Sequence, residues 1–295
     1  MPRQTFLFLF ALILGLTAVV YWQGLDGGFW FDDYGQIVFN PAIEMKGIDP
    51  SSLVRAAKGS NSGPWGRPIS MVSFALDHYF FGLQPFPYKL DNLLIHLVNV
   101  ALVASLASLL LCATAANDDR LFRSRVVVLA ASAWWALHPL CVTSVLYVVQ
   151  RMTSLSSLFT LLGLICYCRS RVLALTGGPA GAWEALSLLG VGTVLSVFCK
   201  EIGLLAPAYA AVIEIFVFRF ESPRSRDRRV LKLVFIGGGL ACAFFLAGFL
   251  LLHPQWMDNA YANRSFNMEQ RLLTEARILW LYLRLMSLPT ASAMA

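Results

Sequence analysis

Long runs of hydrophobic residues, separated by short polar segments, make up most of the chain. The runs lie at residues 6–22, 90–113, 126–137, 155–167, 185–198, 204–218 and 230–252. A weaker run at residues 272–288 contains Arg277 and Arg284, and we expect it to lie partly along the membrane interface. Because a helix needs about 20 apolar residues to cross a bilayer, the shorter runs predict tilted helices joined by tight hairpins. The pattern predicts an all-α, polytopic membrane helix bundle of about seven to eight spans.

The composition supports a membrane protein. Hydrophobic residues make up 58% of the 295 residues and charged residues 14%, whereas soluble domains usually carry about 25% charged residues. The first run is preceded only by Arg3 and lacks a small-x-small cleavage site before Tyr21 and Trp22. We therefore expect residues 6–22 to be a retained signal anchor rather than a cleaved signal peptide.

Basic residues gather in alternate loops, which predicts the orientation. Arginines and one lysine crowd the segments 120–125, 169–171 and 219–232. The positive-inside rule places these segments and Arg3 in the cytoplasm. The net charge of +6 is then an orientation signal, so it is no evidence for nucleic-acid binding, and we expect no nucleic-acid partner.

This orientation organises the chain as a single membrane domain, residues 1–295. Its expected parts are a first span (6–22), an extracytoplasmic loop (23–89), a helix bundle (90–252), a second extracytoplasmic loop (253–275) and a partial last span (276–295). In the first loop, Asp49 is expected to cap a helix that runs to about Lys58. Residues 70–81 place apolar side chains at helical spacing. The first loop is therefore expected to be a cap of short helices over the bundle.

Two adjacent carboxylates, Asp32 and Asp33, follow the first span by about ten residues. They can be read as caps of a short helix that begins near Tyr34. They can also be read as a general base with a neighbour that binds a cation or orients the base. Spacing alone leaves both readings open.

Other polar residues are expected at the same end of the bundle. Asn92, His96 and Asn99 share one helix face, which indicates either interhelical hydrogen bonds or the wall of a polar cavity. The remaining candidates at this level are Arg67, His138, Gln150, Arg151, Lys200 and Glu201. Carboxylates, histidines and cations therefore collect at the outer rim, whereas the inner rim holds only basic residues. This asymmetry predicts a site that opens outward and handles an anionic group, of which phosphate suits Arg and Lys best.

Several motifs resemble a known family when they are read together. They are "FWFDDYGQIVFNP", "GRPISMVSFALDHYFFGLQPFPYKLDNLLIHLVN", "LHPLCVTSVLYVVQRMTSLSSLF" and "CKEIGLLAPAY". In this order, and over nearly the whole chain, they look like the membrane half of the GT-C class of glycosyltransferases. The pattern is most similar to the transmembrane and tetratricopeptide-repeat mannosyltransferases and their bacterial relatives. The chain shows no 34-residue helical repeat itself, so we expect either a shortened member or part of a longer enzyme.

The resemblance implies transfer of a sugar from a polyprenyl-phosphate donor to a glycan or protein acceptor, on the extracytoplasmic side. Asp33 or Asp32 would be the general base, and a divalent metal, if one assists, would bind these two residues. Arg67, Arg151 and Lys200 would bind the donor phosphate. Asn92, His96, His138, Gln150 and Glu201 would line the pocket. We expect a multi-pass protein of a bacterial inner membrane, in contact with membrane lipids and with its active site facing the periplasm.

Two other classes of function stay open. A non-catalytic membrane scaffold or partner subunit would keep the same fold without needing Asp33 for chemistry. A transporter is less favoured, because it would place paired ionisable residues near the bilayer midplane and often shows inverted repeats.

Overall fold

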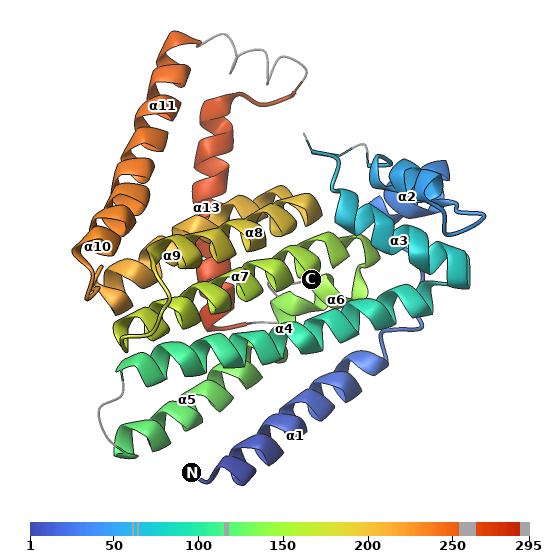
Figure 1. Cartoon of the computed structure of the whole chain (residues 1–295). Coiled ribbons are helices and arrows are strands. Elements are labelled where there is room, and N and C mark those ends of the chain that lie inside the picture. The colour runs from blue at the N-terminus through green and yellow to red at the C-terminus, as the bar shows by residue number, and fades with distance from the viewer. Residues whose placement is uncertain (61, 64, 115–117, 254–263, 290–295) are drawn as a thin grey trace.

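The computed structural model describes residues 1–60, 62–63, 65–114, 118–253 and 264–289 (Figure 1). These residues form helices and turns, and no strand occurs among them. The helices are α1 (Arg3–Trp22), α2 (Pro50–Ala57), α3 (Pro68–Phe81), α4 (Pro85–Thr114), α5 (Asp118–Ala136), α6 (Val142–Leu146), α7 (Arg151–Leu175), α8 (Ala182–Cys199), α9 (Ala206–Ile213), α10 (Ser225–Lys232), α11 (Gly238–Leu252) and α13 (Met268–Ser287).

Six helical segments among the described residues are long and apolar enough to span a membrane. They are Arg3–Trp22, Pro85–Leu111, Val148–Leu175, Ala182–Cys199, Glu201–Phe218 and Ser225–Leu252. A seventh forms if Arg123–Ala136 and Pro139–Leu146 count as one span, bent by 51°. Proline explains this break, since it cannot donate a helical hydrogen bond. The expected polytopic all-α bundle is confirmed, with six or seven candidate spans.

The expected eighth span is not among these segments. Its residues fall in α13 (Met268–Ser287), which is helical but charged at five positions. These positions are Glu269, Arg271, Glu275, Arg277 and Arg284. Charges at this density make burial in hydrocarbon costly. Helix α11 projects away from the other helices (Figure 1), and none of its side chains is buried.

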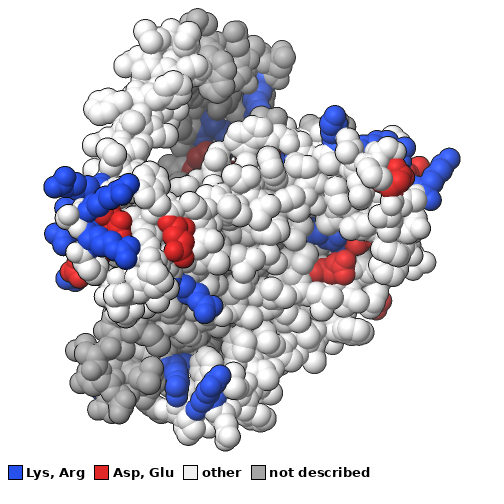
Figure 2. All heavy atoms as spheres, viewed as in Figure 1, with Lys and Arg blue, Asp and Glu red and all other residues white. Residues whose placement is uncertain are grey.

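The bundle has two chemically different ends, which we call the loop end and the basic end. At the loop end, α2 and α3 lie beside the start of α4 (Figure 1). The basic end contains the N-terminus and α10. Figure 2 shows many Lys and Arg gathered over α10 with a few acids among them, and charges of both signs around α2 and α3. The excess of basic residues near α10 follows the pattern on which the positive-inside rule rests.

The first loop packs on the bundle through a core of its own. Met71 and Phe74 of α3 are fully buried with Ile43, and they pack with Val148 and Met152 near the start of α7. Burial of each such side chain contributes roughly 1.5–3 kcal/mol. The loop helices are therefore part of the folded bundle.

Both helices that we expected in this loop are confirmed. Asp49 caps α2 by accepting the amide hydrogens of Ser51 and Ser52, each at 3.0 Å. Helix α3 begins at Pro68, where proline is tolerated because a first-turn amide has no helical partner.

Helices α7 and α8 cross at two glycines. A Cβ atom built on Gly192 would lie 2.6 Å from the Cα atom of Gly163 and 3.0 Å from the carbonyl oxygen of Phe159. Real side chains do not approach backbone this closely, so only glycine at position 192 permits the observed contact. Small residues at a helix crossing are typical of membrane bundles.

A larger residue at this crossing should separate the two helices. Gly192→Val is expected to lower the thermal unfolding temperature of the purified chain, at a cost of about 1–3 kcal/mol or more from overpacking. Gly190→Val is the matched control, because a Cβ at Gly190 meets no atom within 4 Å. Fluorescence-detected size-exclusion chromatography after heating measures both variants. Equal melting of the two would contradict the close crossing.

Candidate functional site

Asp33 is a buried carboxylate that joins the first loop to the start of α7. Its Oδ1 atom accepts the Val149 amide hydrogen at 2.7 Å, and its Oδ2 atom accepts that of Trp30 at 2.9 Å. Burial raises the pKa of Asp33 above the usual aspartate value, although these backbone N–H groups and the Lys89 ammonium oppose the rise. Both oxygens of Asp33 are therefore engaged inside the protein.

The expected capping role of the two acids is wrong in detail. A short π-helical turn does begin at Tyr34 and runs to Val38, but no side chain caps it. Asp33 instead binds the amide of Trp30, three residues before it, and an amide 116 residues away in the sequence. This long-range bond cannot be read from local spacing.

Asp32 differs from its neighbour because its side chain is exposed. Its backbone amide donates to the Tyr147 hydroxyl at 2.8 Å. The preceding residue, Phe31, has φ = 45°, a left-handed conformation that is costly for an aromatic residue. Such strain persists only where the surrounding structure fixes it, and it is common at functional sites. The local fold therefore presents the Asp32 carboxylate to solvent from a fixed backbone.

A lysine contacts the residues that follow Val149. The Lys200 ammonium, just after α8, donates to Thr153 Oγ1 at 2.7 Å and to Gln150 Oε1 at 3.4 Å. An ammonium has three hydrogens, so one remains for a ligand. Burial and the nearby Arg67 guanidinium lower the pKa of Lys200, while Glu201 opposes this. Gln150 directly follows Val149, the partner of Asp33, so the structure brings the acids and Lys200 to one segment, residues 147–150.

Arg67 and Glu201 form a two-point ion pair beside Lys200. Arg67 Nε donates to Glu201 Oε1 at 3.2 Å, and Arg67 Nη2 donates to Oε2 at 3.0 Å. Gly63 lies against this pair, because a Cβ built there would fall 1.6 Å from Glu201 Oε1. Its φ of 77° also favours glycine. The guanidinium of Arg67 is thus largely occupied by a protein carboxylate.

Arg151 is 1% exposed and lies in a closed polar network. Its Nε donates to Asn92 Oδ1 at 2.8 Å and its Nη2 to the Tyr88 carbonyl at 2.7 Å. The same Nη2 atom is 2.6 Å from Asp77 Oδ2. The ring of Phe74 adds a cation–π contact at 5.0 Å. The structure therefore places Arg151 inside the protein, with its donors bonded to protein groups.

The polar helix face of α4 also serves interhelical bonding. Asn99 donates to the Ser154 carbonyl at 2.8 Å, and His96 Nε2 contacts the Ala136 carbonyl at 3.0 Å. Asn92 donates to the Val148 carbonyl at 3.3 Å and receives the Arg151 bond. All three are buried. Of the two open readings, the structure favours helix–helix bonding over a cavity wall.

His138 lies apart from these groups, at the break between α5 and α6. Its Nδ1 atom accepts the Leu140 amide hydrogen at 3.2 Å and so caps the turn Pro139–Cys141. The ring stands edge-on to Trp134 at 5.5 Å, and its Nε2 atom is buried without a hydrogen-bond partner. The position of His138 is explained by this turn.

The acid pair does not fit a divalent-metal site in this conformation. Asp33 is buried and each of its oxygens already accepts a backbone hydrogen bond, which leaves Asp32 as the exposed carboxylate. Among the described residues, no group of three or more His, Cys, Asp or Glu side chains could hold a metal ion.

Sequence reasoning missed three groups at this site, namely Tyr147, Thr153 and Lys89. Tyr147 and Thr153 lie in the quoted segment "LYVVQRMTS" on either side of Gln150 and Arg151, so their closeness in sequence was an available signal. Lys89 is buried at the start of α4, its Nζ 3.5 Å from the Gly24 carbonyl. Lys89 lies next to Asp33 only because of how the loop folds, so the neighbouring sequence does not predict this contact.

Comparison with known proteins finds similarity over most of the chain. It is 29% identical to protein O-mannosyl-transferase TMTC3 of Homo sapiens over 219 residues, which is 70% of this chain and 21% of that protein. It is 29% identical to protein O-mannosyl-transferase Tmtc2 of Drosophila melanogaster over 271 residues, 88% of this chain and 27% of the relative. Protein O-mannosyl-transferase F38B6.6 of Caenorhabditis elegans matches at 26% identity over 280 residues, 92% of this chain and 36% of the relative.

The chain spans about a fifth to a third of the length of these relatives. No family model matches it. No solved structure matches it either. Over most of its own length, the chain therefore resembles the protein O-mannosyl-transferases of the TMTC type, as its sequence motifs predict.

Proposed function

We propose that this chain carries the catalytic site of a membrane glycosyltransferase. The site lies at the loop end, which we place on the extracytoplasmic side of the membrane. A sugar moves from a polyprenyl-phosphate donor to an acceptor hydroxyl. The names of the relatives support mannose as the sugar and a protein as the acceptor. The positive-inside rule supports the orientation, because the basic loops lie at the opposite end.

The observation that carries the proposal is the difference between the two adjacent acids. Asp33 is buried with both oxygens bonded to backbone amides, whereas Asp32 is exposed and held through Tyr147. A general base needs a free carboxylate within reach of the proton that it removes. We therefore assign the base to Asp32, and assign Asp33 to positioning the backbone from which Asp32 projects.

The transfer step balances with these groups. The acceptor hydroxyl loses its proton to the Asp32 carboxylate as its oxygen bonds to the sugar C1. The bond between C1 and the phosphate oxygen breaks, and its electron pair leaves with the lipid phosphate. The free hydrogen of the Lys200 ammonium is directed to this developing charge, which fixed cations stabilise. Arg67 adds positive potential but keeps its bond to Glu201.

The proposal is tested with the purified chain in liposomes. We expect a serine- and threonine-containing peptide to gain the mass of one hexose when mannosyl-phosphoryl-polyprenol is supplied. A nucleotide-linked mannose should give no product. In cells that make the protein natively, its deletion should remove a hexose from surface proteins. An unchanged glycoproteome in the deletion strain would contradict the proposal and favour a scaffold role.

Substitution of Lys200 tests the phosphate assignment. Lys200→Met is expected to raise the KM for the lipid donor and to lower kcat, by about tenfold or more in kcat/KM, because one charge-assisted contact to phosphate is worth about 1.5–3 kcal/mol. Lys200→Arg should restore part of the activity. Lys46→Met, which removes an exposed lysine of the first loop, is the control for loss of one positive charge. Liposome kinetics measure all three, and equal effects of Lys200→Met and Lys46→Met would contradict the assignment.

A further inference from the structure

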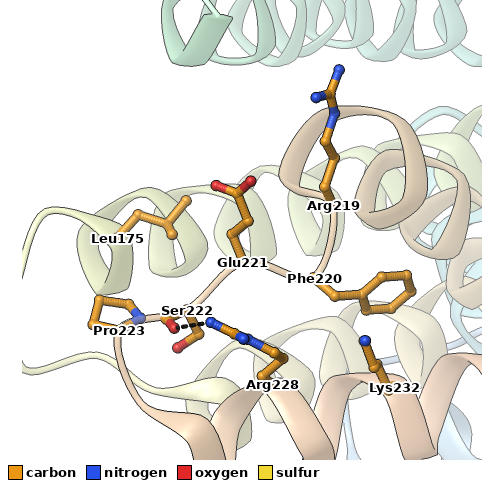
Figure 3. Close-up of a pocket in the computed structure, with 8 residues that line it drawn as sticks. All are labelled: Leu175, Arg219, Phe220, Glu221, Ser222, Pro223, Arg228 and Lys232. Carbon is orange, nitrogen blue, oxygen red and sulfur yellow. Dashed lines mark hydrogen bonds between the residues drawn. The ribbon is translucent and has the colours of Figure 1, made fainter.

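A polar cavity lies at the basic end of the bundle, far from the acid pair. It has a volume of about 530 Å³ and forms where the Glu201–Phe218 span turns into α10. Figure 3 shows Arg228 and Lys232 projecting from α10 toward this turn, which contributes Arg219, Phe220 and Glu221. None of these residues has a part in the proposed transfer.

The turn is fixed by unusual backbone and a buried ion pair. Arg219 and Phe220 are both left-handed, with φ of 52° and 58°. Phe220 is 8% exposed and packs in a small core. Arg171 donates to the Glu221 carbonyl at 2.7 Å, and the same side chain is 2.8 Å from Glu214 Oε1. This wall of the cavity is therefore anchored from inside the bundle.

The cavity carries an excess of positive charge. Its lining includes three cations, Arg219, Arg228 and Lys232, against one acid, Glu221. Within the part of the chain that the structure describes, Arg228 donates one hydrogen bond, to the Ser222 carbonyl at 3.2 Å. A guanidinium has five donors, so Arg228 retains capacity for a ligand. Phosphate is the anion that Arg and Lys recognise best, since it accepts several charge-assisted hydrogen bonds.

Apolar surface begins directly beside these charges. Leu175 and Phe220 line the same cavity. Leu233, the residue after Lys232, is 72% exposed and starts the long apolar stretch that leads into α11. A ligand in this place would meet cations at one end and lipid-facing side chains at the other. That combination matches a phospholipid rather than a free anion.

We propose that this cavity binds the headgroup phosphate of an anionic phospholipid from the adjoining leaflet. Arg228 and Lys232 contact the phosphate, and the acyl chains lie along Leu233 and the surface that follows it. Glu221 weakens this binding by repulsion. The site is independent of sugar transfer, so it stands whether or not the chain is a transferase.

The test is native mass spectrometry of the detergent-solubilised chain with added lipid. Dioleoyl-phosphatidylglycerol is compared with dioleoyl-phosphatidylcholine and with inorganic phosphate at the same concentration. Saturable binding of phosphatidylglycerol is expected. Lys232→Gln should weaken it about fivefold, since a cation near an anionic lipid is worth about 1 kcal/mol. Lys232 is chosen because its side chain makes no hydrogen bond to the described residues of the turn.

Two further variants separate a specific effect on binding from misfolding and from a general loss of charge. Glu221→Gln should tighten phosphatidylglycerol binding about fivefold, a gain that misfolding cannot produce. Arg226→Gln removes an exposed charge of α10 outside the cavity and should leave the affinity unchanged. Equal weakening by Arg226→Gln and Lys232→Gln, equal affinity for phosphatidylcholine, or equal binding of inorganic phosphate would each overturn the proposal.

Discussion

Replacement of Asp32 by Asn is expected to lower the rate of sugar transfer by about a hundred- to ten-thousandfold and to leave thermal stability unchanged. Asn has nearly the same shape as Asp but cannot accept the proton of the acceptor hydroxyl. The Asp32 side chain is exposed, and its structural bond to Tyr147 comes from its backbone amide, which Asn retains. Liposome transfer rates and melting temperatures, taken on the same preparations, measure the two effects separately.

Asp33 provides the contrast. Asp33→Asn replaces one buried oxygen by an NH₂ group, which cannot accept a hydrogen bond. One of the two amide hydrogens, that of Trp30 or that of Val149, then loses its acceptor. We expect a loss of about 1–3 kcal/mol in the free energy of unfolding, with a decrease in activity that follows the loss of folded protein. Asp26→Asn, an exposed acid of the same loop, is the neutral control. A full loss of transfer in stable Asp33→Asn, with an active Asp32→Asn, would reverse the assignment of the base.

Replacement of Arg151 by Met is expected to lower the free energy of unfolding by about 3–5 kcal/mol, the cost of leaving a buried carboxylate without its partner. Asp77 is that carboxylate, and burial raises its pKa to about 6 even beside the guanidinium. Arg151 also anchors Asn92 and the Tyr88 carbonyl, so its removal leaves several buried acceptors unpaired. Thermal unfolding in detergent measures the loss.

Two comparisons make this prediction specific. The double variant Asp77→Asn with Arg151→Met should be more stable than Arg151→Met alone, because it no longer buries an unpaired charge. Arg271→Met breaks an exposed pair with Glu275 and should cost about 0.5 kcal/mol or less. If Arg151 bound the donor phosphate instead, Arg151→Met would keep its stability and raise the KM for the donor.

Hydrophobic periodicity was enough to predict the architecture, because membrane helices follow from long apolar runs whatever their partners. The start of α2 was equally predictable, since Asp49 accepts hydrogen bonds from nearby amides and Pro50 is favoured in the first turn of a helix. The bend between α5 and α6 was harder to predict from the sequence. Run length alone placed a full span at residues 126–137, whereas Pro139 divides a longer segment into two parts.

The roles of the polar residues depended on contacts that sequence does not display. Arg151 and Asp77 are 74 residues apart in the chain (151 − 77), and Asp33 and Val149 are 116 apart. Only the folded first loop brings them together. An arginine that closes a buried network and an arginine that binds a ligand look the same in a sequence, so sequence alone cannot decide whether Arg151 binds phosphate.

The glycine crossing of α7 and α8 has a mechanical consequence. The two helices touch backbone to backbone near their middles, at Gly163 and Gly192, while their ends reach opposite faces of the bundle. The contact between the two helices continues on both sides of the glycines: the hydroxyls of Ser156 and Ser196 are hydrogen-bonded at 2.7 Å, and Leu164, Ala185 and Leu189 share one buried cluster. Lys200 follows one end of α8 directly, and Arg224 bonds the Ala180 carbonyl just before the other end. Because α8 is held against α7 over its length, it is a rigid link between the loop end and the basic end of the bundle.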